Sequence, residues 1–256
     1  MKRFSGFSVG GVAAVAVIAA LLIIVIVAIV NGNHEVDYSK YDFNSVIGPD
    51  SDNGNIGDHV KGEADAPVLI FEYADFQCPG CASVNTKINK IVEELDGKLA
   101  VVYRSFLLPY HQNATAAASA AEAAGLQGYW REYADKLFKE QDEWGYSSAA
   151  DRTEYFKKYF VEVTDGKGDL DKFHTDISST AVSKKISFDM GIGKAIDVSA
   201  TPALYVDGQF IDWGDSDKNG TGSVVINGET ISWDGALSGD EFMNLIKKIV
   251  NTKIGK

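Results

Sequence analysis

A strongly apolar run, a pair of cysteines and a helix-forming run follow one another in the first half of the chain. Residues 68–74 (VLIFEYA) are nearly all apolar, which indicates a buried strand. Over residues 83–95 the apolar side chains recur at helical spacing, and residues 99–104 (LAVVYR) form a second strand-like run. Asp96-Gly97 supplies the helix stop between them. This order predicts a βαβ unit.

The two cysteines of the chain, Cys78 and Cys81, lie between the predicted strand and the predicted helix. A sulfur at a helix N-terminus meets unpaired backbone N–H groups and the positive end of the helix dipole, which favour a thiolate. Pro79 suits the first turn of a helix, and Gly80 adds no bulk between the sulfurs. We therefore expect a redox pair in which Cys78 is attacked and Cys81 resolves the mixed disulfide.

Two other roles of the cysteine pair stay open. A structural disulfide usually closes a longer loop, where the entropic gain is larger. A structural zinc site needs four ligands, and the histidines of the chain have no metal-binding spacing. We expect neither a metal nor an organic cofactor, because a dithiol carries both electrons of the exchange.

Glu72 lies inside the predicted buried strand, six residues before Cys78. A buried carboxylate is unfavourable unless it has a partner or binds a proton. We expect Glu72 to exchange a proton with Cys81 as that sulfur changes state. The alternative is a solvated glutamate at the edge of the sheet.

Thr201-Pro202 directly precedes the apolar run at residues 203–206. Proline is tolerated at the first position of a strand, and an X-Pro bond in a tight loop can be cis. Taken alone, this dipeptide also fits an ordinary turn.

Residues 9–30 contain no charged residue and consist almost wholly of Val, Ala, Ile, Leu and Gly. As a helix, such a run spans about 30 Å, the thickness of a bilayer core. A cleavable signal peptide has a shorter apolar run and a small-residue cleavage site, so we expect an uncleaved signal anchor, with cleavage as the alternative. Lys2 and Arg3 precede the run. The positive-inside tendency therefore places residues 1–8 in the cytoplasm and the rest of this single-pass protein outside it, at the cell membrane.

The remainder of the chain divides into a spacer and a folded domain. Residues 31–62 are rich in Asn, Asp, Gly and Ser, which predicts a polar spacer in which Ile47, Ile56 and Val60 are possible docking points. Residues 63–256 form the predicted domain. The formal net charge of -12 argues against a nucleic-acid partner.

Helical patterns fill residues 112–196, and Asn113 is expected to cap the first helix of this block. The expected elements after the block are strands at 203–206, 209–211, 223–226 and 229–233, the last two joined by a turn at Asn227-Gly228, and a helix at 239–253.

Asp215, Asp217 and Asn219 match the first half of a calcium-binding loop. Ile226 stands at the twelfth position, where such loops use a bidentate glutamate. A polar hairpin loop is the favoured interpretation, with calcium binding as the alternative.

Several segments together resemble the DsbA-like thiol–disulfide oxidoreductases. Residues 71–81 (FEYADFQCPGC) resemble the active-site segment of that family, and residues 198–208 (VSATPALYVDG) resemble its cis-proline loop. Residues 128–144 are similar to part of its inserted helical domain. The resemblance covers about residues 60–256, and the membrane-anchored form is similar to thiol oxidases of Gram-positive-type bacteria.

The resemblance implies an α/β protein with a thioredoxin fold and a helical domain inserted between its second and third core strands. It implies that Cys78 is the nucleophile and Cys81 the resolving cysteine. Glu72 would be the buried proton carrier, and Pro202 the cis-proline beside the disulfide. Thr201 would offer backbone groups to a substrate peptide lying as an added strand. The expected substrate-binding residues are Thr201, Pro79 and Gly80.

The function expected from this resemblance is the introduction of disulfides into unfolded exported proteins that carry free thiols. A separate membrane oxidase would restore the disulfide. The same cysteine pair also fits a reductase or isomerase that starts from the dithiol, because direction depends on relative reduction potentials. A further alternative is a membrane-tethered peptide-binding or chaperone module with a merely structural bridge. Gly80 stands where strongly oxidising members of the family carry His. The two residues between the cysteines, here Pro79 and Gly80, help to set the reduction potential of the pair.

Overall fold

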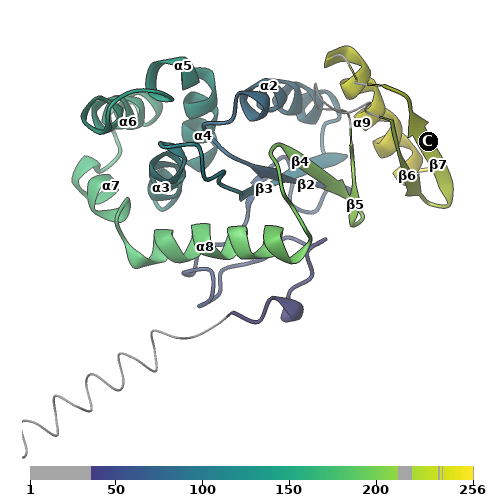
Figure 1. Ribbon diagram of the computed structural model, residues 1–256, viewed down its shortest axis with the longest axis horizontal. Helices are drawn as coiled ribbons and strands as arrows, with labels where there is room; N and C mark the ends of the chain where they lie inside the picture. The colour runs from purple at the N-terminus through teal and green to yellow at the C-terminus, as the bar shows by residue number, and fades with distance from the viewer. Residues whose placement is uncertain (1–35, 213–220, 236, 238, 256) are drawn as a thin grey trace, which may run out of the picture. The chain divides into compact units, whose positions relative to one another are not determined.

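The computed structural model describes residues 36–212, 221–235, 237 and 239–255. From Tyr38 onward the described residues form one compact unit, with helices on both faces of a central sheet (Figure 1). The expected anchor at 9–30 lies outside the described residues, as does the candidate calcium loop at 215–219. No helix in the described part of the chain is both long and apolar enough to cross a membrane.

The predicted βαβ unit is confirmed. Strand β2 (Val68–Ala74) pairs in parallel with β3 (Leu99–Ser105), and helix α2 (Pro79–Glu94) connects them. The apolar face of α2, which includes Ile88 and Ile91, joins a core cluster with one apolar face of each strand: Val68 and Ile70 of β2, and Leu99 and Val101 of β3. Each fully buried aliphatic side chain of this kind contributes roughly 1.5–3 kcal/mol. The first turn of α2 is thereby fixed against the end of β2.

The later strands bring a distant loop to the end of β2. Strand β4 (Ala203–Val206) pairs antiparallel with β2, with Tyr73 opposite Ala203. The start of β4 therefore lies beside the end of β2, where the cysteine pair follows. Strand β5 (Gln209–Phe210) continues the sheet, whose order is β1-β3-β2-β4-β5, with β1 formed by His59–Lys61.

A separate hairpin and the last helix complete the fold. Strands β6 (Gly222–Ile226) and β7 (Glu229–Trp233) form a two-stranded sheet, and helix α9 (Gly239–Lys253) follows. The Asn227-Gly228 turn has φ values of 51° and 82°, as the predicted tight turn requires. These elements confirm the predicted hairpin and terminal helix.

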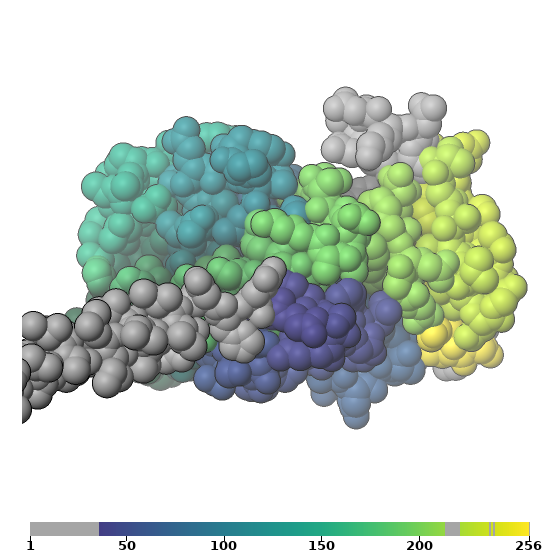
Figure 2. Space-filling model, turned by 60° about the horizontal axis from the view of Figure 1, so that its bottom comes forward, coloured from purple at the N-terminus to yellow at the C-terminus, as the bar shows by residue number. Residues whose placement is uncertain are grey.

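The described part of the segment at 31–62 differs from the expected polar spacer, because it packs on the domain. It contains the short helix η1 (Tyr38–Lys40) and strand β1 (His59–Lys61), which pairs antiparallel with β3. The ring of Tyr41 lies 4.8 Å from that of Phe188, centroid to centroid. Figure 2 shows this segment, in purple, lying against the green part of the chain.

A buried arginine explains why this polar segment folds. Arg104 on β3 is fully buried, and its Nη2 donates to Asp58 Oδ2 at 2.7 Å. The same guanidinium donates to the carbonyl oxygens of Phe43 and Ser45, both at 2.9 Å. These bonds replace the hydration that the backbone and the carboxylate lose, so hydrophobic periodicity is not needed here.

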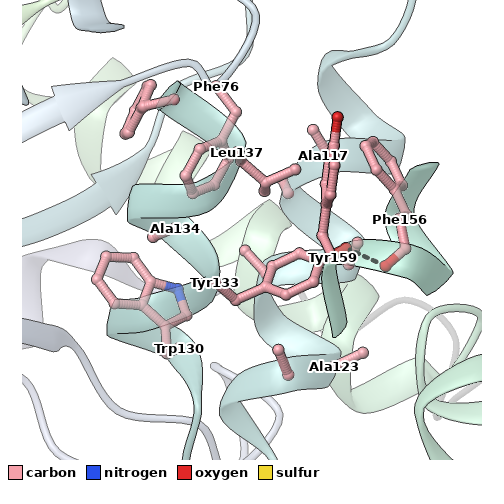
Figure 3. Packing of buried hydrophobic residues seen from close by; sticks show 14 of the residues in the cluster. Phe76, Ala117, Ala123, Trp130, Tyr133, Ala134, Leu137, Phe156 and Tyr159 are labelled. Atoms are coloured by element: carbon pink, nitrogen blue, oxygen red, sulfur yellow. Dashed lines mark hydrogen bonds between the residues drawn. The ribbon is translucent and has the colours of Figure 1, made fainter. Parts of the chain in front are cut away.

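Helices α3 to α8 follow β3 and precede β4 along the chain, and they enclose an aromatic core (Figure 3). Tyr133 Oη donates to the carbonyl of Phe156 at 3.0 Å inside this core. The ring of Phe76, two residues before the first cysteine, lies 4.8 Å from that of Phe138, centroid to centroid. The helical block is thus packed directly on the cysteine-bearing segment. Its helices are α3 (Ala114–Gly125), α4 (Trp130–Lys139), α5 (Gln141–Trp144), α6 (Ala149–Val163), α7 (Leu170–Asp176) and α8 (Thr180–Ala195).

Candidate active site

Cys78 occupies the N-cap position of α2, and Pro79 is the first helical residue. Both Cys78 and Cys81 are in the thiol form in the structure. Cys78 is 8% exposed, whereas Cys81, almost one turn further into the helix, is completely buried. Pro79 and Gly80 between them are exposed. An incoming thiolate can therefore approach Cys78 and not Cys81.

The surroundings separate the acidities of the two thiols. The hydrogen bond from the Cys81 thiol, together with backbone N–H groups at the start of α2, lowers the pKa of Cys78 to about 6. Burial raises the pKa of Cys81 well above its ordinary value. At neutral pH Cys78 is thus the sulfur that carries negative charge in the dithiol form.

The loop before β4 closes over Cys78. The Thr201–Pro202 peptide bond is cis, and the Thr201 carbonyl oxygen lies 3.4 Å from Cys78 Sγ. Thr201 Oγ1 is buried and has no hydrogen-bond partner among the described residues. A Cβ atom at Gly80 would lie 3.1 Å from Pro202 Cδ, which is tighter than ordinary contact. The small residue at position 80 therefore allows the proline ring to lie against the cysteine turn.

Glu72 is buried in the centre of the sheet. Its strand β2 lies between β3 and β4, so the alternative of a solvated glutamate at a sheet edge is wrong. The residue is 1% exposed, and its Oε1 has no hydrogen-bond partner in the described part of the protein. Burial raises the pKa of Glu72 to about 7, although the positive charge of Lys61 opposes the change. Glu72 can therefore hold or release a proton near neutral pH.

Lys61 is a buried cation that sequence patterns did not single out. Its side chain is 1% exposed, and Nζ donates to Asp135 Oδ1 at 2.7 Å. It also donates to the side-chain oxygens of Asn85 and Asn89 on α2. A lysine in a short polar segment carries no motif, because its partners are far away in the sequence.

The helical block also holds the backbone around Cys78. Gln141 Nε2 on α5 donates to the carbonyl oxygens of Phe76 at 2.7 Å and Cys78 at 3.0 Å. Gln77 Nε2 donates in return to the carbonyl oxygen of Gly145 at 2.7 Å. Neither glutamine belongs to a recognisable pattern, so sequence reasoning missed both.

Asn113 does not cap α3 with its side chain, contrary to expectation. Its Nδ2 instead lies 3.1 Å from each of the carbonyl oxygens of Trp144, Gly145 and Ser147. The Asn113 side chain binds the turn at the end of α5 because the buried carbonyl oxygens of that turn need hydrogen-bond donors.

The described residues contain no group of three or more His, Cys, Asp or Glu placed to hold a metal ion. His59 lies against Glu122 and His111 against Asp75, each at 2.8 Å.

The class of protein follows from these features: an α/β protein with a thioredoxin-like fold, a Cys-x-x-Cys pair at a helix N-terminus and a cis-proline beside it. Comparison with known sequences agrees with this thioredoxin-like fold. The family described as Thioredoxin matches residues 54–224, and the chain belongs to it.

Solved structures share the fold. BdbD from Bacillus subtilis, in its oxidised form, superposes with a TM-score of 0.57 at 18% identity, over 83% of this chain and all of that one. Wolbachia pipientis alpha-DsbA1 gives a TM-score of 0.55 at 21% identity, covering 77% and 93% of the two chains. A thioredoxin-like oxidoreductase from Silicibacter pomeroyi gives 0.53 at 19% identity, covering 75% and 91%. At these identities the likeness establishes the fold alone.

Curated relatives match over part of their length. Proteins named Na(+)/H(+) antiporter NhaA 1 from Mycolicibacterium gilvum and Mycolicibacterium vanbaalenii are each 36% identical over 59% of this chain. The matched region makes up 24% and 23% of those two proteins, about a quarter of their length.

Proposed function

We propose that this protein is a thiol–disulfide oxidoreductase that introduces disulfides into exported proteins. The observation that carries the proposal is the unequal environment of the two sulfurs. Cys78 is accessible and has a pKa of about 6, whereas Cys81 is buried with a raised pKa. Stabilisation of the Cys78 thiolate favours the dithiol form over the disulfide, which makes the disulfide a stronger oxidant.

The proposed reaction begins with the Cys78–Cys81 disulfide. A substrate thiolate attacks Cys78 Sγ, the bond between the two protein sulfurs breaks, and Cys81 leaves with the electron pair. Glu72 supplies the proton that the buried Cys81 sulfur takes up. A second substrate thiolate then attacks the substrate sulfur of the mixed disulfide, so the substrate leaves oxidised and Cys78 becomes a thiolate.

The surface around Cys78 supports a polypeptide substrate. The backbone of Thr201 lies at the sulfur, and Pro79 and Gly80 are exposed beside it. An extended substrate segment would lie as an added strand along the loop before β4, with its cysteine at Cys78.

Location and reoxidation complete the proposal. The apolar run at 9–30 supports an anchor that leaves the thioredoxin-like domain outside the cytoplasm, where disulfides form and persist. Unfolded exported proteins with free thiols are the proposed substrates. A membrane oxidase is the proposed partner that restores the disulfide, because each turnover leaves the protein reduced.

Two cysteine variants test the proposal with reduced, unfolded ribonuclease A as substrate. The wild-type disulfide form should restore ribonuclease activity stoichiometrically, and Cys78→Ser should not. Cys81→Ser, with Cys78 first activated as a mixed disulfide with a small thiol, should form a stable mixed disulfide with the substrate. Unchanged substrate oxidation by Cys78→Ser would show that the bridge is only structural, and that the protein acts as a binding module. If the wild-type protein instead reduces or reshuffles disulfides and does not form them, the reductase or isomerase alternative holds.

A further inference from the structure

A buried aspartate directly after β2 is held by donors from two loops. Asp75 is completely buried. Its Oδ1 accepts a hydrogen bond from the backbone N–H of Gln77 at 2.8 Å. Its Oδ2 accepts from the backbone N–H of Leu108 at 2.9 Å and from His111 Nδ1 at 2.8 Å. These donors fix the orientation of the carboxylate, and with it the residue that carries it.

The backbone of the same aspartate contacts the resolving cysteine. The N–H of Asp75 donates to Cys81 Sγ at 3.5 Å. Burial raises the pKa of Cys81, and this hydrogen bond opposes that effect. Cys81 is the sulfur that must leave as a thiolate when Cys78 is attacked. A donor already aimed at it stabilises the charge that develops on departure, as preorganised N–H groups do in other reactions.

We propose that His111 is a positioning residue for disulfide exchange: through Asp75 it holds the N–H group that stabilises the departing Cys81 sulfur. The inference rests on the proposed exchange at the cysteine pair and adds a residue to it. His111 lies in the loop between β3 and α3, where its side chain is 12% exposed. The ring of Tyr110, which is 70% exposed, packs against it with centroids 4.7 Å apart. His111 thus fills the space between the surface and the buried carboxylate.

Reduction by dithiothreitol isolates this step. A dithiothreitol thiolate attacks Cys78 Sγ, the Cys78–Cys81 bond breaks, and Cys81 takes the electron pair and then a proton. The second thiol of the reagent closes a ring with the first sulfur and releases Cys78. The protein gains two electrons, and the reagent becomes its cyclic disulfide. The departure of Cys81 occurs in the first step, so its rate reports on the donor.

Three substitutions of His111 separate positioning from packing. His111→Leu removes the donor to Asp75. His111→Asn retains an amide N–H near the position of Nδ1, whereas His111→Gln carries its amide further out, near the position of Nε2. The full chain, oxidised and in detergent, is mixed with dithiothreitol, quenched with acid, and its free thiols are trapped at each time point.

We expect reduction of His111→Leu and His111→Gln to be about tenfold slower than wild type, the effect of losing about one aligned hydrogen bond. His111→Asn should stay within about twofold of wild type. The matched control is His59→Leu, because His59 also lies 2.8 Å from a buried carboxylate and its side chain is 14% exposed. That carboxylate, Glu122, belongs to α3 and not to the cysteine-bearing segment. The control should lower stability without slowing reduction.

Two results would overturn the inference. One is reduction of His111→Leu at the wild-type rate, or of His111→Gln if the leucine variant does not fold. The His111–Asp75 contact would then only connect two loops and have no effect on the exchange. The other is an equal slowing in His59→Leu, which would trace the effect to general destabilisation. Failure of the wild-type pair to exchange with dithiothreitol at all would instead refute the proposed function. A slow His111→Leu variant beside a fast His111→Asn variant supports the inference.

Discussion

Substitution of Glu72 by glutamine should change how the stability of the protein depends on pH. The pKa of Glu72 is raised from 4.5 to about 7 by burial. Between these values the folded protein holds a proton that the unfolded chain has lost. The free energy of unfolding therefore falls as pH rises through this window, and the full loss is present above pH 7.

The size of the effect follows from the two pKa values. At 1.36 kcal/mol for each tenfold change in proton affinity, the raised pKa of Glu72 lowers the free energy of unfolding by about 3 kcal/mol at pH 8 and about 1 kcal/mol at pH 5, relative to acid pH. Glutamine has the same shape and does not titrate. The difference in unfolding free energy between Glu72→Gln and wild type should thus move by about 2–3 kcal/mol in favour of the variant from pH 5 to pH 8.

Urea unfolding followed by circular dichroism measures this difference at the two pH values. Both proteins are studied in the disulfide form, so that neither sulfur titrates. Glu63→Gln is the control, because Glu63 is exposed, and it should follow wild type at both pH values. An equal difference between Glu72→Gln and wild type at pH 5 and pH 8 would refute the reasoning. Glu72 would then be ionised in the folded protein at both pH values, and it would not serve as a proton carrier.

Three further perturbations test other parts of the site and the fold. The absorbance of the Cys78 thiolate at 240 nm should titrate with a midpoint near pH 6 in the reduced wild-type protein and at a higher pH in the Cys81→Ala variant, which lacks the Cys81 hydrogen bond; equal midpoints would contradict that role of Cys81. Gly80→Ala should destabilise the protein by about 1 kcal/mol in thermal unfolding, because the new Cβ meets the ring of Pro202; an unchanged Tm would mean that the ring moves away freely. Asp58→Asn should lower the unfolding free energy by about 3–5 kcal/mol, because it leaves the charge of buried Arg104 without its partner, and a loss below 1 kcal/mol would contradict that role.

The parts of the fold that were predictable from sequence are those whose signals are local. Apolar runs predict the strands at 68–74 and 99–104. Residues that accept positive φ predict the turn at Asn227-Gly228. Strand β1 was missed because a three-residue strand has no period of its own, and because its segment is held by Arg104, far along the chain.

The same distinction applies to the site. The cysteines and the Thr201-Pro202 loop were found because their chemistry requires fixed residue types at short spacing. Gln141 donates to carbonyl oxygens 65 and 63 positions away, and His111 contacts a carboxylate 36 positions away; no local pattern encodes such contacts. The residues proposed to carry the reaction were therefore recognisable, whereas the hydrogen bonds of Gln141 and His111 required the structure.

The reduction potential of the cysteine pair tests the proposed oxidase function most directly. The protein is equilibrated with glutathione buffers of defined ratio, and its free thiols are trapped and counted. With Cys78 acidic and Cys81 buried, the potential should lie nearer the strongly oxidising value of about −120 mV known for DsbA than the value of about −270 mV known for thioredoxin. A potential close to that of thioredoxin would contradict the proposed direction and assign the pair to a reductase.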